Sequence, residues 1–202
     1  NSTGDSNIAI GYQALDANTT ADNNVAVGDS ALKANTTGTN NVAVGKDALL
    51  TNVSGQQNVA IGVCALNANT GYNNVAIGYQ ALDANIGGDS NVAVGLHSLL
   101  LNTTGNYNVA VGRKALCSNT TGLTNVAIGL TALNDNTEGT NNIAIGCAAL
   151  LDHSTGNNNV AIGVATLFDN TTASDNTALG SYSMVKNTTG TANLAAGTNA
   201  MA

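Results

Sequence analysis

Few side chains in this sequence are of the types that carry out acid–base, nucleophilic or metal chemistry. The two histidines, His97 and His153, have no recurring acid or nucleophile beside them at a matched spacing, and a catalytic triad or a metal cluster requires such neighbours. The cysteines Cys64, Cys117 and Cys147 fit no zinc-binding pattern. We therefore predict that the protein is not an enzyme and has no catalytic, cofactor-binding or metal-binding residue.

Carboxylates could still form a glycosidase pair, which needs two acids a few ångströms apart. The acids here fall at variable positions, which is typical of a solvated surface; they include Asp16, Asp83, Asp135, Asp152 and Asp169. The calcium-binding repeat Gly-Gly-x-Gly-x-Asp and a phosphate-binding glycine loop are both absent from the sequence.

The composition narrows the possible partners. A net charge of −7 with five lysines and arginines disfavours nucleic acid and anionic membranes, because so few cations cannot follow a line of phosphates. No apolar segment approaches the roughly eighteen residues of a membrane-spanning helix. With 43% hydrophobic residues, the chain nevertheless has enough apolar surface to fold.

The elements that hold these residues follow from one motif, Asn-Val-Ala-Val/Ile-Gly. It returns every seventeen residues, with a single interval of sixteen between Asn58 and Asn74. A short fixed period indicates units that bury their faces against one another, so residues 1–202 are predicted to form a single repeat array that is uncapped at both ends. The twelve copies begin at Asn7, Asn24, Asn41, Asn58, Asn74, Asn91, Asn108, Asn125, Asn142, Asn159, Asn176 and Asn193.

Each repeat continues with further columns of matching residues. Four residues after the motif glycine stands Leu or Met, preceded by a small residue, and a Thr-Thr-Gly-like turn follows. Seventeen residues are too few for a strand and a useful helix, but they suit two short strands, the second extended or turn-like, and two turns. We predict an all-β parallel β-solenoid, a β-roll or β-helix of about 12 coils, about 57 Å long at about 4.8 Å per coil.

The motif strand is apolar on both faces, which leaves two arrangements open. If Ala26 and its equivalents point inward beside Leu32, then Val25 and Val27 form an apolar stripe outside, and such a stripe favours self-association. If the valines point inward instead, the rod would be a self-sufficient monomer. We favour the first arrangement.

Seven residues after the motif glycine, the repeats carry asparagine, with His153 as the exception. Stacked asparagines can pair their amides along the rod, so we expect a structural ladder. Seven of these asparagines also lie in Asn-x-Ser/Thr triplets, which are potential glycosylation sites; they are Asn18, Asn35, Asn52, Asn102, Asn119, Asn170 and Asn187.

The two ends of the sequence match each other. Asn1-Ser2-Thr3-Gly4 repeats the turn Asn187-Thr188-Thr189-Gly190, and joining Ala202 to another Asn1 would place successive motif asparagines sixteen residues apart. We expect continuation, either within a longer chain or by head-to-tail stacking, and a head-to-tail contact that does not close makes a filament.

The motif with its following small and apolar residues, as in Asn24–Leu32, resembles the head repeats of YadA-like trimeric autotransporter adhesins. It is similar also to repeats in bacteriophage tail-fibre proteins. The resemblance covers all twelve copies and implies a left-handed β-roll whose three chains associate laterally. This chain departs from the adhesin heads by its longer coil, which adds the Asn-Thr-Thr-Gly turn.

These observations predict a structural or adhesive extracellular fibre, or a filament subunit that stacks end to end at a cell surface. Its partners would be further copies of itself, by head-to-tail contact or as a lateral trimer, and a host-surface or carbohydrate ligand. One alternative is a segment of a phage tail fibre or tail spike that binds surface carbohydrate, on a virion tail. Another is an ice-binding solenoid, suggested by the threonines Thr36 and Thr37, although these lie in a turn and not in strand rows.

Overall fold

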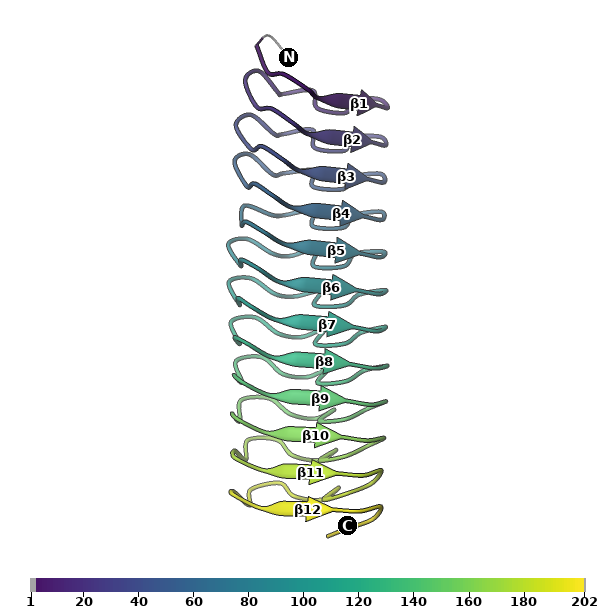
Figure 1. The fold of residues 1–202 in the computed structure, drawn as a ribbon, viewed down its shortest axis with the longest axis vertical. Coiled ribbons are helices and arrows are strands. Elements are labelled where there is room, and N and C mark those ends of the chain that lie inside the picture. Colours follow the sequence, from purple (N-terminus) through teal and green to yellow (C-terminus); the bar gives the residue numbers. More distant parts are fainter. Residues whose placement is uncertain (1–2, 202) are drawn as a thin grey trace.

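The chain folds into a rod of stacked rungs with its two ends at opposite ends of the rod (Figure 1). The computed structural model describes residues 3–201, and this part of the chain contains strands and turns but no helix. Each rung, numbered after its strand, carries one three-residue strand. The strands are β1 (Ile8–Ile10), β2 (Val25–Val27), β3 (Val42–Val44), β4 (Val59–Ile61), β5 (Val75–Ile77), β6 (Val92–Val94), β7 (Val109–Val111), β8 (Val126–Ile128), β9 (Ile143–Ile145), β10 (Val160–Ile162), β11 (Thr177–Leu179) and β12 (Leu194–Ala196). The predicted all-β parallel solenoid is confirmed.

The strands form one parallel sheet in sequence order, and every junction has the same register. The central alanines pair with each other, as Ala26 does with Ala43. The register survives the sixteen-residue interval, because Ala60 still pairs with Ala76; the missing residue shortens only the turn before β5. The expected head-to-tail junction involves Asn1, Ser2 and Ala202, which lie outside the described residues.

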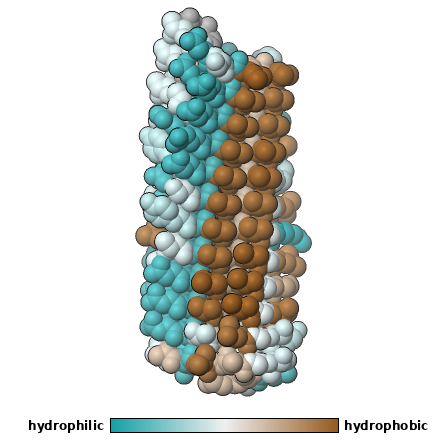
Figure 2. All heavy atoms as spheres, viewed as in Figure 1, coloured by the Kyte–Doolittle hydropathy of each residue, from teal (hydrophilic) through white to brown (hydrophobic). Residues whose placement is uncertain are grey.

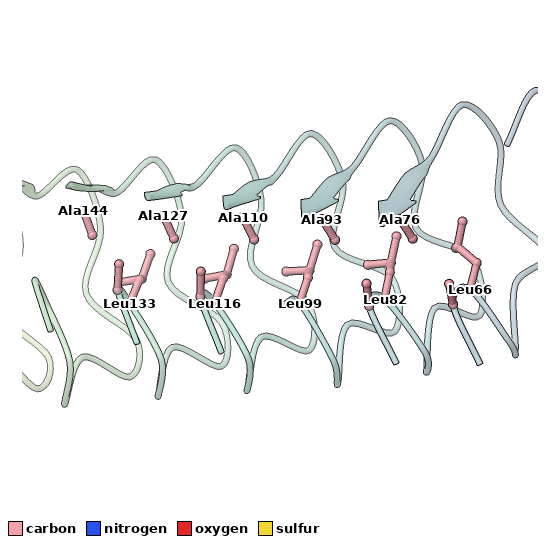
Figure 3. Close-up of a cluster of buried hydrophobic side chains, with 14 of the residues drawn as sticks. Leu66, Ala76, Leu82, Ala93, Leu99, Ala110, Leu116, Ala127, Leu133 and Ala144 are labelled. Carbon is pink, nitrogen blue, oxygen red and sulfur yellow. The ribbon is translucent and has the colours of Figure 1, made fainter. Parts of the chain in front are cut away.

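The core is a single column of alanine and leucine inside the rod. The central alanine of β2–β10, the leucine four residues after each motif glycine in rungs 2–10, and most of the small residues before those leucines are fully buried. Figure 3 shows Leu82, Leu99 and Leu116 directed at the strand alanines. Alanine therefore lies inside and valine outside, as in the arrangement that we favoured, because the small side chain leaves room for one leucine per rung.

The segment around this leucine is a turn and not a second strand. In rung 2, Ser30 and Leu32 adopt left-handed backbone angles, with φ of 59° and 51°, and the other rungs repeat both. Such angles cost a residue with a side chain about 1–2 kcal/mol. Hydrogen bonds to the neighbouring rungs hold them in place: Leu32 N–H donates to the Ala48 carbonyl at 3.0 Å and Ser30 N–H to the Tyr12 carbonyl at 2.8 Å.

The motif glycine makes the sharp turn that ends each strand. Gly95 has φ of 133°, and a Cβ built there would lie 2.6 Å from the carbonyl oxygen of Gly112 in the next rung. Both the angle and the close approach exclude a side chain at this position. The stacking distance between rungs therefore depends on glycine at the end of each strand.

Candidate interaction surface

Two columns of branched apolar side chains run along one side of the rod, at the first and third positions of the strands. Figure 2 shows them as two parallel brown columns along the rod. Strands β1–β10 all carry Val or Ile at both positions, and the columns are interrupted only near one end, by Thr177 and Ala196. We call this surface the apolar face; its residues are Ile8, Ile10, Val25, Val27, Val42, Val44, Val59, Ile61, Val75, Ile77, Val92, Val94, Val109, Val111, Val126, Ile128, Ile143, Ile145, Val160, Ile162, Leu179 and Leu194.

The apolar face is partly open to solvent along its length. Even in the middle of the rod, where neighbours cover each side chain from both sides, Ile77 is 38% and Ile128 39% exposed. The position after the motif glycine forms a mixed border to this face. Exposed apolar residues are interspersed there with charged residues such as Lys46 and Arg113; the apolar ones are Tyr12, Val63, Tyr79, Leu96, Leu130 and Val164.

The apolar face is large for a protein surface. With rungs about 4.8 Å apart and the two columns about 7 Å apart, it measures about 57 Å by about 11 Å once side-chain width is included, or about 600 Å². This is at the upper end for the largest apolar patch of a soluble monomer. Two such faces in contact would bury about 1,200 Å², which reaches the range of specific, stable interfaces.

The asparagines form two internal ladders. The turn asparagine Asn102, seven residues after Gly95, donates from Nδ2 to Asn85 Oδ1 at 2.8 Å and to the Gly105 carbonyl at 3.0 Å. The strand asparagine Asn91, the first motif residue of rung 6, donates to the same carbonyl at 2.8 Å. Asn18, Asn35, Asn52, Asn102, Asn119 and Asn170 are buried and Asn187 is half-buried. The predicted ladder is confirmed, and the triplets in the folded rod present no exposed asparagine.

The turn threonines differ in how their hydroxyls are used. The first threonine of a pair donates along the rod, as Thr103 Oγ1 does to the Thr120 carbonyl at 2.9 Å and Thr120 Oγ1 to the Thr137 carbonyl at 3.0 Å. The second threonine, for example Thr104 or Thr121, is exposed. The pairs therefore expose threonines on turns, in place of rows on a strand.

Three acids at the same position of the repeat, Asp135, Asp152 and Asp169, stack on the successive rungs 8–10. Burial raises the pKa of Asp152, and the carboxylates of Asp135 and Asp169 raise it further. Burial also raises the pKa of Asp83, with smaller opposing effects from a hydrogen bond with Asn67 and from His97. Asp16 is exposed. No pocket opens between residues 3 and 201.

The remaining candidate residues lie apart. His97 contacts Gln80, with 3.1 Å between Nε2 and Oε1, whereas His153 is buried in the asparagine column. Cys64 is half-buried, Cys117 buried and Cys147 exposed, and all three are free thiols. Within the described part of the chain, no three His, Cys, Asp or Glu side chains come together as metal ligands. The prediction that these residues do no chemistry stays a prediction.

No helix among the described residues is long and apolar enough to cross a membrane. Comparisons with protein-family models, with curated proteins and with solved structures find no match to this chain.

Proposed function

We propose that this chain is a stiff structural rod of an extracellular or cell-surface fibre, which associates side by side through the apolar face and stacks end to end. The observation that carries the proposal is the continuity of this face, since ten consecutive strands, β1–β10, carry Val or Ile at both outward positions. A ligand bound at one place would need only a few of these residues. A face that repeats with the rungs suits a partner that repeats in the same way, which is a second copy of the chain.

Stiffness follows from the direction of the backbone hydrogen bonds. In rung 2, Val25 N–H donates to the Asn41 carbonyl and Gly28 N–H to the Ile10 carbonyl, each at 2.8 Å, so one rung is tied to both neighbours. The buried leucine and asparagine columns add packing and amide pairs along the same axis. Bending the rod would stretch all of these contacts together.

End-to-end stacking is supported by the equivalence of the rungs. Because every junction has the same register, the upper edge of any rung is complementary to the lower edge of any other. An open parallel edge with unpaired N–H and C=O groups recruits further strands. More repeats or another copy would extend the rod in the same way.

The lateral contact can be tested with β-branched polar replacements. Val75, Val92, Val109 and Val126 are changed together to Thr, which keeps the shape and strand propensity of the side chain; Thr177 occupies the same position in β11. We expect the native chain to have a mass that is a multiple of 20.0 kDa in analytical ultracentrifugation. On dilution, oligomers of the variant should dissociate at a protein concentration at least tenfold higher than that at which oligomers of the native chain dissociate.

The matched control carries four apolar-to-Thr changes at exposed positions off the apolar face, namely Val53, Ile86, Leu101 and Leu123. It should associate as the native chain does, with the same circular dichroism spectrum. A native chain that stays monomeric at high concentration would refute lateral association.

Electron microscopy tests the end-to-end contact. Stacking predicts filaments of uniform width, and a population of short discrete rods would contradict it.

A further inference from the structure

Rung 9 departs from the rule that the turn asparagines follow from rung 3 to rung 8. In a regular rung, Nδ2 donates both to the glycine carbonyl three residues on and to the asparagine Oδ1 of the preceding rung. Asn119, for example, bonds to the Gly122 carbonyl at 3.1 Å and to Asn102 Oδ1 at 2.8 Å. At this position rung 9 carries His153, which is fully buried.

Both ring nitrogens of His153 face carbonyl oxygens. Nδ1 lies 2.9 Å from the Asn170 carbonyl and Nε2 lies 2.8 Å from the Gly156 carbonyl. A carbonyl only accepts, and a neutral imidazole has one N–H. The neutral ring therefore satisfies one carbonyl and turns a nitrogen lone pair toward the other. The imidazolium would satisfy both, but it would place a charge inside the rod.

The histidine also interrupts the ladder on either side. Asn136 Oδ1 in rung 8 is buried and has no hydrogen-bond partner. In a regular rung the next asparagine would donate to Asn136 Oδ1. Asn170 Nδ2 retains only a 3.3 Å contact with the Ala173 carbonyl. An unpaired buried acceptor is destabilising, and rung 9 lacks the amide pairs that join a regular rung to the rungs on both sides of it.

No counter-ion faces the ring. The previous rung presents Asn136, the following rung presents Asn170, and the ring's own turn presents Gly156. Burial lowers the pKa of His153 from 6.5, and the two carbonyls oppose this shift without reversing it. The acids on these three rungs lie toward solvent and do not contribute to this shift; they are Asp135, Glu138, Asp152, Asp169 and Asp175.

We propose that the turn of rung 9 is an acid-sensitive joint, at which protonation of His153 opens the stack while the regular ladder of rungs 2–8 stays closed. A solvated turn accepts the proton more readily than the closed one. As the pH falls below about 6.5, the open form therefore binds more protons than the closed form, and the opening equilibrium rises by at most about tenfold per pH unit. The rise ends once the closed form is protonated too.

The experiment follows hydrogen exchange of residues 152–157 and 170–174 between pH 7 and pH 4, corrected for intrinsic exchange rates, in the native chain and two variants. In His153→Asn, the asparagine restores the ladder, so protection of this turn should be higher and should lose its dependence on pH between 7 and 5. In His97→Asn, the half-buried histidine is removed, and the native pH dependence should remain.

Titration of the two histidine side chains by NMR provides a test that needs no variant to fold. The His153 ring should titrate with a midpoint below 6.5. A midpoint at or above 6.5 would overturn the proposal, as would the same pH-dependent exchange in His153→Asn.

A reverse variant, Asn102→His, should create a second acid-sensitive joint in rung 6. An unchanged hydrogen-exchange profile around residue 102 in that variant would also refute the proposal.

Discussion

Replacing the turn asparagine Asn102 by aspartate exchanges one NH₂ group for an oxygen and leaves the shape of the side chain unchanged. Its Nδ2 donates to two acceptors, Asn85 Oδ1 and the Gly105 carbonyl, while its Oδ1 accepts from Asn119 Nδ2 at 2.8 Å. After the change, three oxygens meet where one donor group stood. The Gly105 carbonyl keeps a donor in Asn91 Nδ2, but Asn85 Oδ1 and the new aspartate oxygen are left without one. At about 1–3 kcal/mol for each of these two buried acceptors, the loss is about 2–6 kcal/mol.

The control is Asn157→Asp on the outer surface. Asn157 uses its Oδ1 to accept from the Thr140 N–H at 2.7 Å, and aspartate keeps that oxygen. Aspartate already occupies the equivalent position at Asp89, where it accepts from the Tyr72 N–H. We expect Asn157→Asp to change the free energy of unfolding by less than about 0.5 kcal/mol.

Urea denaturation followed by circular dichroism measures both variants at pH 7 and pH 4. An ionised carboxylate at position 102 would be buried without a cation, so folding raises its pKa and its destabilising effect grows as the pH rises through that pKa. The Asn102→Asp variant should therefore be less impaired at pH 4 than at pH 7. Equal stabilities of the two variants at pH 7 would refute the assignment of Nδ2 as the essential group of the ladder.

Three further changes test the core, the strand end and the outer acids. Leu99→Ala should lower the free energy of unfolding by about 3–5 kcal/mol because the buried leucine has no neighbour that can fill its space, whereas Leu101→Ala on the surface should cost less than about 0.5 kcal/mol in the same urea titration. Gly95→Ala should cost about 3 kcal/mol or more, from the φ angle and the clash together; a melting temperature equal to that of the native chain would contradict this. Asp152→Asn should raise stability at pH 7, by less than about 1 kcal/mol for so exposed a group. Since folding raises the pKa of this carboxyl, the gain should disappear at pH 3, where the aspartates are protonated, and a gain of equal size at both pH values would refute the cause.

The repeat period was sufficient to predict the fold, because seventeen residues admit few ways to form a coil. The inward alanine could be favoured from its size beside Leu32, but the alternation alone allowed the opposite face. The turn-like nature of the Ala-Leu segment could not be derived, because leucine has no intrinsic preference for the left-handed φ of 51° that it adopts. That angle comes from hydrogen bonds to adjacent rungs, which are contacts between residues distant in sequence.

The apolar face could be predicted from the sequence, because an inward alanine places the flanking Val and Ile side chains outside. The mixed border formed by the residues after the motif glycine could not. The residue types after the motif glycine vary from Tyr12 to Arg113, and a variable column gives no signal when the copies are aligned. His153 was visible as the exception in its column. Its two carbonyl contacts depend on the positions of Gly156 and Asn170 around the ring, which only the three-dimensional arrangement supplies.

The common register of the strand pairs affects how such a protein can change over generations. Ala26 pairs with Ala43 as Ala144 pairs with Ala161, so adding or removing one whole repeat creates no contact of a new kind. Unequal recombination between the repeated stretches of its gene would yield longer or shorter versions that fold at once. Length can then vary among descendants without a redesign of any part.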